Sequence, residues 1–136
     1  MASASSHRAA AIVRDSARAH RARRRAVKAV TSGPASAFAH LTAMGIDTDT
    51  AHRYAATLTK RAKALGETPV TGLTVKKRPG KKGITRTRSA DLGRKKRHRI
   101  TPVALWTRAQ ITAALHGYQP RDTAARERFA RLALTA

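Results

Sequence analysis

Residues 41–54, which read LTAMGIDTDTAHRY, encode the end of one helix, a turn and the start of a second helix. Gly45 suits the left-handed backbone conformation that ends a helix. Asp47 or Thr48 can cap the helix that follows, because a short polar side chain accepts a hydrogen bond from the first turn. We therefore expect a sharp corner between two helices here, with the rest of the chain organised around it.

The two helices at this corner have recognisable limits. The first is predicted over about residues 34–44, with Ser32 as its candidate N-cap. The second ends at Gly66 and repeats apolar residues at spacings of 4, 3, 4 and 3, which places them on one face. The residues of this expected buried face are Ala51, Ala55, Leu58, Ala62 and Leu65.

Helices are also expected on both sides of the corner. Residues 6–30 are rich in helix formers and carry a discontinuous apolar stripe. Thr101 followed by Pro102 is a typical helix start, which predicts a helix over about 102–116, and another is predicted over about 122–134. The residues of these last two helices expected to face a core are Leu105, Trp106, Ala109, Ile111, Leu115, Ala125, Phe129 and Leu132.

The segment 68–88 has a different character. Val70, Leu73, Val75 and Ile84 are β-branched or large, and they flank a Pro- and Gly-containing turn signal. A basic β-hairpin or loop is expected there. The cationic run 94–99 has no apolar partner and is expected to be a solvated linker or arm.

Composition sets the fold class. The chain has 136 residues, with 29 Lys+Arg against 7 Asp+Glu and a formal net charge of +22. Leu, Ile, Val and Phe contribute only 22 residues, about 16%, so the core must be thin. We expect a mainly α, small helical domain, divided into a basic N-terminal helix or arm (1–33), a helical corner (34–68), a basic hairpin and linker (69–101) and a C-terminal helical pair (102–136).

The same composition excludes several classes. With no Cys, the chain has no disulfide framework, thiolate zinc site or thiol nucleophile. Its longest uncharged stretch, residues 29–46, is interrupted by Gly33 and Pro34 and is too polar for a membrane-spanning helix. The strong positive charge points to a polyanionic partner, beside which part of the chain is expected to become fully ordered.

The corner itself resembles the helix-turn-helix family of DNA-binding proteins over about 20 residues around Gly45. The shared features are apolar residues on the first helix, glycine in the turn, an apolar residue after it and a start rich in Thr and Asp. The resemblance implies that the second helix enters the major groove of DNA and that Arg53 reads bases. The residues that it places nearest the base edges are Thr48, Asp49, His52 and Arg53. Two ordinary packed helices joined at Gly45 are the structural alternative.

Three basic clusters are expected to contact phosphates, which adds affinity without sequence readout. The expected basic hairpin directly follows the corner in the chain. In winged helix-turn-helix proteins, a β-hairpin called the wing occupies this position. The clusters are Arg21, Arg23, Arg24 and Arg25; Lys76, Lys77, Arg78, Lys81 and Lys82; and Arg94, Lys95, Lys96, Arg97 and Arg99.

Other site patterns are weaker. The stretch 80–83, Gly-Lys-Lys-Gly, matches the loop of KH RNA-binding domains, but that loop joins two helices and here a β-like segment precedes it. The acidic residues are scattered, and Asp47 with Asp49 is better suited to capping than to metal binding. The six His residues lack the i,i+4 spacing of a metal pair. We expect no enzymatic activity, no metal and no cofactor.

The sequence thus predicts a DNA-binding protein that acts mainly through phosphates, as a regulator or accessory factor of a plasmid, phage or other mobile element. Heavy use of Ala and of Arg over Lys favours a GC-rich bacterium and a cytoplasmic, nucleoid-associated location. The oligomeric state is open, a dimer included. An RNA-binding protein of ribosomal type is the first alternative. A basic membrane-surface or partner-binding protein, anchored by its first helix, is the second.

Overall fold

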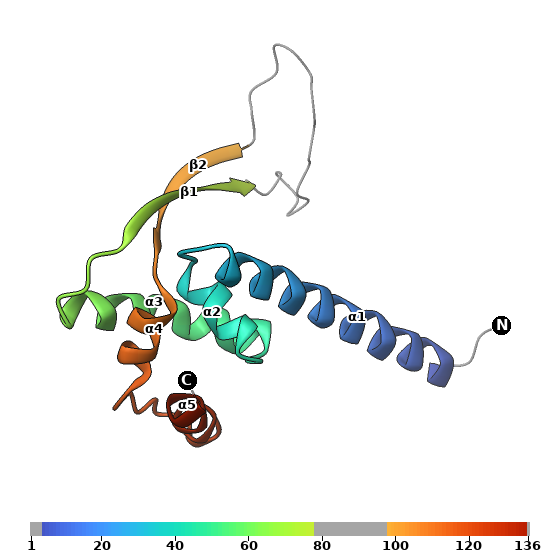
Figure 1. The fold of residues 1–136 in the computed structure, drawn as a ribbon. Helices are drawn as coiled ribbons and strands as arrows, with labels where there is room; N and C mark the ends of the chain where they lie inside the picture. The colour runs from blue at the N-terminus through green and yellow to red at the C-terminus, as the bar shows by residue number, and fades with distance from the viewer. Residues whose placement is uncertain (1–3, 78–97, 136) are drawn as a thin grey trace, which may run out of the picture.

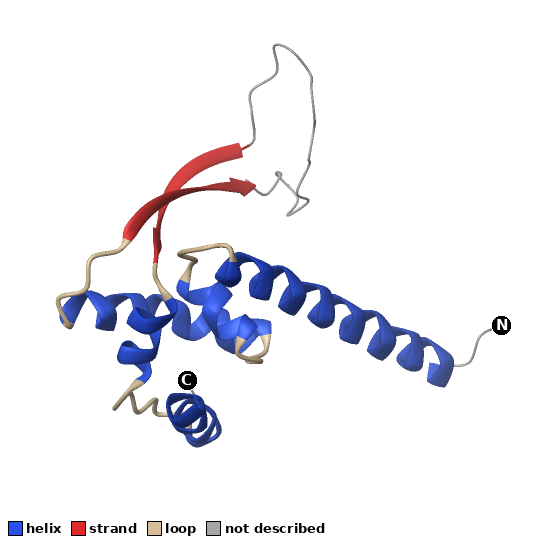
Figure 2. Cartoon of the chain, viewed as in Figure 1, coloured by secondary structure: helices blue, strands red, loops and turns tan. Residues whose placement is uncertain are grey.

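The computed structural model describes residues 4–77 and 98–135. These residues form a mainly helical fold with one two-stranded antiparallel sheet, as expected. In Figure 1, the long first helix reaches away from the helical body and the β-ribbon rises from that body; Figure 2 shows the same view by secondary structure. The elements are α1 (Ala4–Thr31), α2 (Ala37–Ala43), α3 (Thr48–Ala64), β1 (Val70–Lys77), β2 (His98–Leu105), α4 (Arg108–Leu115) and α5 (Thr123–Thr135).

The corner between α2 and α3 has the predicted form. Gly45 has φ of 95°, in the left-handed region, and the Ile46 N–H donates to the Leu41 carbonyl at 3.0 Å. Asp47 is the N-cap of α3, and its carboxylate accepts from the N–H of Thr50 at 3.0 Å and from the Thr50 hydroxyl at 2.8 Å. The turn is therefore closed by local hydrogen bonds, and α3 starts in a fixed direction relative to α2.

The cap of α2 differs from the prediction. Ser36 is its N-cap, with its hydroxyl accepting from the Ala39 N–H at 3.2 Å. Ser32 instead belongs to the end of α1, where its hydroxyl donates to the Lys28 carbonyl at 2.9 Å. Both serines precede a helical stretch, but only Ser36 has the extended backbone next to the helix that capping requires.

The core gathers apolar faces of α2, α3, α4 and α5. Of the face predicted for α3, Ala51, Leu58 and Ala62 are fully buried, whereas Leu65 is 53% exposed because it lies beyond the last helical residue. Ala109 is exposed, contrary to expectation. The largest completely buried side chains include Trp106, Phe129, Leu41, Leu58, Ile111 and Leu115.

The segment after Arg99 differs most from the prediction. Thr101 and Pro102 do not begin a helix but lie in β2, and α4 begins after Thr107, whose side chain and that of Gln110 form a reciprocal capping box. Pairing with β1, which sets Pro102 opposite Leu73, outweighs the local helix signal. Proline is tolerated because each strand of a two-stranded sheet is an edge strand.

The first strand of the predicted hairpin is confirmed. β1 pairs with residues 98–105, so His98 and Arg99 of the expected linker belong to a strand. The expected turn at 78–83 and the expected return strand around Ile84 lie outside the described residues.

Trp106 ties the base of the ribbon to the helical body. Its backbone forms an isolated bridge with Ala35, with N–H to O distances of 2.9 and 2.8 Å. The Nε2–H of buried His40 donates to the same Trp106 carbonyl at 2.8 Å. These bonds join the α1–α2 connection to the β2–α4 connection, which lie far apart in the sequence.

Candidate nucleic-acid interface

Helix α1 is the most cationic element in the described part of the chain. It carries eight Lys and Arg residues and one acidic residue, Asp15, whose carboxylate lies 3.5 Å from Arg18. Ala26, in its C-terminal half, is buried, and the helix contacts α2. Its N-terminal part extends away from the other elements (Figure 1). The Lys and Arg residues of α1 are exposed.

The predicted cluster on α1 divides between two faces. Arg21 and Arg25 are four residues apart and continue a row begun by Arg14 and Arg18, since residues at spacings of 4, 3 and 4 share a face. Arg23 points elsewhere, and its guanidinium lies beside the corner, 3.8 Å from the position that a Cβ on Gly45 would occupy. All four arginines are exposed, but they do not form one patch.

The start of α3 holds the residues predicted to read bases. Asp49, His52 and Arg53 are exposed, and their spacing puts them on one face of the first two turns. Thr48 is half-buried. The imidazole of His52 is stacked on Phe38, with ring centroids 4.2 Å apart and planes inclined by 27°, which restrains its orientation.

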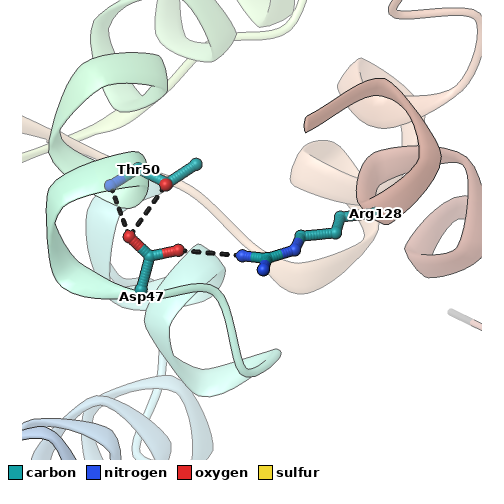
Figure 3. Close-up of polar contacts among 3 residues, drawn as sticks. All are labelled: Asp47, Thr50 and Arg128. Atoms are coloured by element: carbon teal, nitrogen blue, oxygen red, sulfur yellow. Dashed lines mark hydrogen bonds and ion pairs between the residues drawn. The ribbon is translucent and has the colours of Figure 1, made fainter. Parts of the chain in front are cut away.

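A groove that the sequence did not predict lies beside this surface. It encloses about 700 Å³ between α1, the α2–α3 corner and α5, and its basic lining residues are His20, Arg23, Arg128 and Arg131. Arg128 pairs with the α3 cap, its Nη1 lying 3.0 Å from Asp47 Oδ1 (Figure 3). The arginines of the last helix are visible in the sequence, but nothing local indicates that they approach α1.

Asp47 is held in its charged form at this groove. Hydrogen bonds from the Thr50 N–H and hydroxyl are the main causes that hold the pKa of Asp47 below its usual value, and the charge of Arg128 adds to them. The same carboxylate therefore caps α3 and pairs with Arg128 of α5. A consequence is that Asp47 compensates the charge of Arg128, but not that of the other groove arginines.

The ribbon brings a second basic group together by strand pairing. The register sets Lys76 opposite Arg99 and Lys77 opposite His98, at the end of the ribbon away from Trp106. The other residues predicted for this region and for the linker lie outside the described residues; they are Arg78, Lys81, Lys82, Arg94, Lys95, Lys96 and Arg97.

The described ranges also bear on a metal site, on the two tyrosines and on a membrane span. No group of three His, Asp or Glu side chains there is arranged to hold a metal ion. Tyr54 packs edge-on against Tyr118 and Phe129, and the rings of Tyr118 and Phe129 are tilted against each other, so both tyrosines serve packing. Across residues 4–77 and 98–135, every helix is too short or too polar to cross a membrane.

Comparison with known proteins identified no similar protein. No family model matches the sequence, and no curated protein and no solved structure is similar to it at a significant level.

Proposed function

We propose that this protein binds duplex DNA, chiefly through its phosphates, as a regulator or accessory factor of a plasmid, phage or other mobile element in a bacterial nucleoid. The observation that carries the proposal is the charge of α1, a helix that extends from the body. It has eight Lys and Arg residues and one acidic residue. Such a surface favours a polyanion that replaces its counterions.

The spacing of these charges supports the same conclusion. Arg14 and Arg18, Arg21 and Arg25, and Arg24 and Lys28 are each four residues apart. Like charges at this spacing destabilise a helix by a few tenths of a kcal/mol per pair, about the size of the gain from an opposite pair. A phosphate strand alongside α1 removes this repulsion, so helix stability and binding are coupled.

The exposed start of α3 supports duplex DNA over other polyanions. A helix whose N-terminal residues project from a fixed corner has the geometry with which helix-turn-helix proteins enter a major groove. Arg53 is the side chain suited to read a base edge, and Asp49 disfavours approach of phosphates to that face. In this proposal, α3 enters the major groove of the DNA and α1 lies along the DNA backbone. The proposal includes no catalytic step and no cofactor.

A salt series of anisotropy titrations tests the proposal. The full chain is titrated against duplex DNA, single-stranded DNA, structured RNA and anionic liposomes, each with random-sequence duplex competitor. We expect duplex DNA to bind most tightly at moderate salt. Binding of RNA as tight as that of duplex DNA favours a ribosomal-type protein instead, and preference for liposomes favours a membrane-surface protein.

Charge variants locate the interface. Arg21→Gln/Arg24→Gln/Arg25→Gln is expected to lower the slope of log affinity against log salt by about 2.7, since each phosphate contact contributes about 0.9. The matched control is Lys60→Gln/Lys63→Gln/Arg121→Gln, which removes the same charge from exposed positions away from α1. Equal slopes for the two triple variants would show that net charge alone drives binding.

A further inference from the structure

We infer that the groove between α1 and α5 seats one sugar–phosphate strand of the bound nucleic acid, an inference that rests on the proposed function. Its lining includes Arg23 from α1 and Arg131 from α5, which are separated by more than a hundred residues in the sequence. The start of α3 forms part of the same groove through Thr48. A strand seated here passes directly beside the surface that is proposed to read bases.

The charge balance of the groove favours an anionic occupant. Arg128 is compensated by Asp47 at 3.0 Å, whereas no carboxylate among the described residues forms an ion pair with Arg23 or Arg131. Arg23 and Arg131 are both exposed. Their guanidinium groups can therefore contact a ligand without breaking a buried ion pair. The groove is therefore positive where it faces solvent, and the acidic group that it contains is already engaged.

The mixed lining of the groove distinguishes a nucleic-acid strand from a simple anion. Besides the arginines, the lining includes the apolar residues Ala19, Met44, Ile46 and Leu132. A sugar–phosphate backbone alternates anionic phosphates with largely apolar sugar carbons, so it matches a lining that is both cationic and apolar. An inorganic anion or a run of carboxylates uses the cationic residues but leaves the apolar ones in contact with water.

The groove's dimensions agree with a short length of strand. On α1 it extends from Ser16 to Arg23, seven residue steps or about 10 Å along a helix that rises 1.5 Å per residue. The phosphates of one strand are spaced more widely along the strand than the roughly 3.4 Å that each advances along the duplex axis, so at most about three fit along this length. The volume of about 700 Å³ also lies within the range of specific ligand sites.

The first test compares Arg23→Gln/Arg131→Gln with the matched control Lys63→Gln/Arg121→Gln. Each lost phosphate contact lowers affinity roughly fivefold at about 0.15 M salt, so the groove variant is expected to bind duplex DNA roughly 30-fold more weakly than wild type, with a salt slope lower by about 1.8. The loss should be the same for every duplex sequence, because phosphate contacts carry no readout. Circular dichroism verifies that both variants keep their helices.

The outcomes separate the inference from the proposed function. If wild type binds duplex DNA and the groove variant behaves like the control, the inference is overturned while the proposed function stands. If wild type does not bind duplex DNA, both fall. Poly-glutamate serves as a second probe: a groove variant that loses poly-glutamate but keeps duplex DNA would identify the groove as an acidic-peptide site and overturn the inference.

Cross-linking gives a direct measurement that does not depend on charge. Since the chain has no Cys, Ala19→Cys places a single thiol in the groove lining, and Ala64→Cys places one at the exposed end of α3. We expect the thiol at position 19 to couple to duplex DNA that carries thiol-reactive groups on its backbone, and the thiol at position 64 to remain unmodified. Equal coupling at the two positions would contradict the assignment.

Discussion

Acid is expected to weaken the link between the ribbon and the helical body through His40. The imidazole is 1% exposed, its Nε2–H donates to the Trp106 carbonyl, and its Nδ1 atom has no hydrogen-bond partner in the structure. Burial is the main cause that lowers the pKa of His40 below 6.5, and the charge of Arg108 acts in the same direction, against the hydrogen bond to Trp106. A proton on Nδ1 would place an unpaired positive charge inside the protein.

The sign of the pH effect follows from this lowered pKa. Above pH 6.5 His40 is neutral in both the folded and the unfolded chain, and its contribution to stability is complete. As pH falls from 6.5 towards the lower folded-state pKa, the unfolded chain takes up a proton and the folded chain does not. The free energy of unfolding therefore decreases with acid, by at most about 1.4 kcal/mol per pH unit.

Two variants separate the hydrogen bond from the titration. His40→Leu removes both, and we expect a loss of about 1–3 kcal/mol at pH 8, because the Trp106 carbonyl keeps only its bond from Ala35. His40→Gln keeps an N–H donor but cannot titrate, so its loss should be smaller. Both variants should lack the steep dependence on pH that His40 gives to wild type.

Urea unfolding followed by circular dichroism, in steps from pH 8 to pH 5 at constant salt, measures these differences. Because the other titrating groups are common to all three proteins, the difference in unfolding free energy between wild type and each variant isolates His40. We expect this difference to shrink steadily below pH 6.5. A difference that stays constant with pH, or that widens in acid, would refute the assignment of a neutral, buried His40.

Further substitutions test the core, the corner, the ribbon and the proposed readout. Leu58→Ala, at a completely buried position, should cost about 2–5 kcal/mol in urea unfolding, and a loss below 1 kcal/mol would contradict the packing of α3. Asp47→Ala should cost about 0.5–2 kcal/mol by removing the α3 cap, with Asp47→Asn less harmful because it keeps an acceptor. Gly72→Ala should loosen the ribbon, because the new Cβ would lie 2.6 Å from Leu105 Cδ1; unchanged amide exchange in β1 would disprove this contact. Arg53→Ala should reduce discrimination between duplex sequences in competition titrations, whereas a uniform loss of affinity would assign Arg53 to phosphate contact.

The parts of the fold that depend on neighbouring residues could be predicted from the sequence. The corner at Gly45 and Asp47 has the predicted conformation because a left-handed glycine and a capping carboxylate act within a few residues. Helices predicted over 6–30 and 122–134 were found at 4–31 and 123–135 for the same reason. Burial of Leu58 and Phe129 also followed from helical periodicity alone.

The contacts between segments that are distant in the sequence, through strand pairing and helix packing, were seen only in the tertiary structure. Thr101 and Pro102 carry a valid local helix signal, yet the hydrogen bonds and side-chain contacts of pairing with β1 place them in β2. Likewise, charge composition alone establishes that the chain is cationic, but not which cations share a surface. Arg23 and Arg131 line one groove because α1 contacts α2 and Arg128 of α5 pairs with Asp47 at the corner, and both contacts depend on distance in space rather than on spacing along the chain.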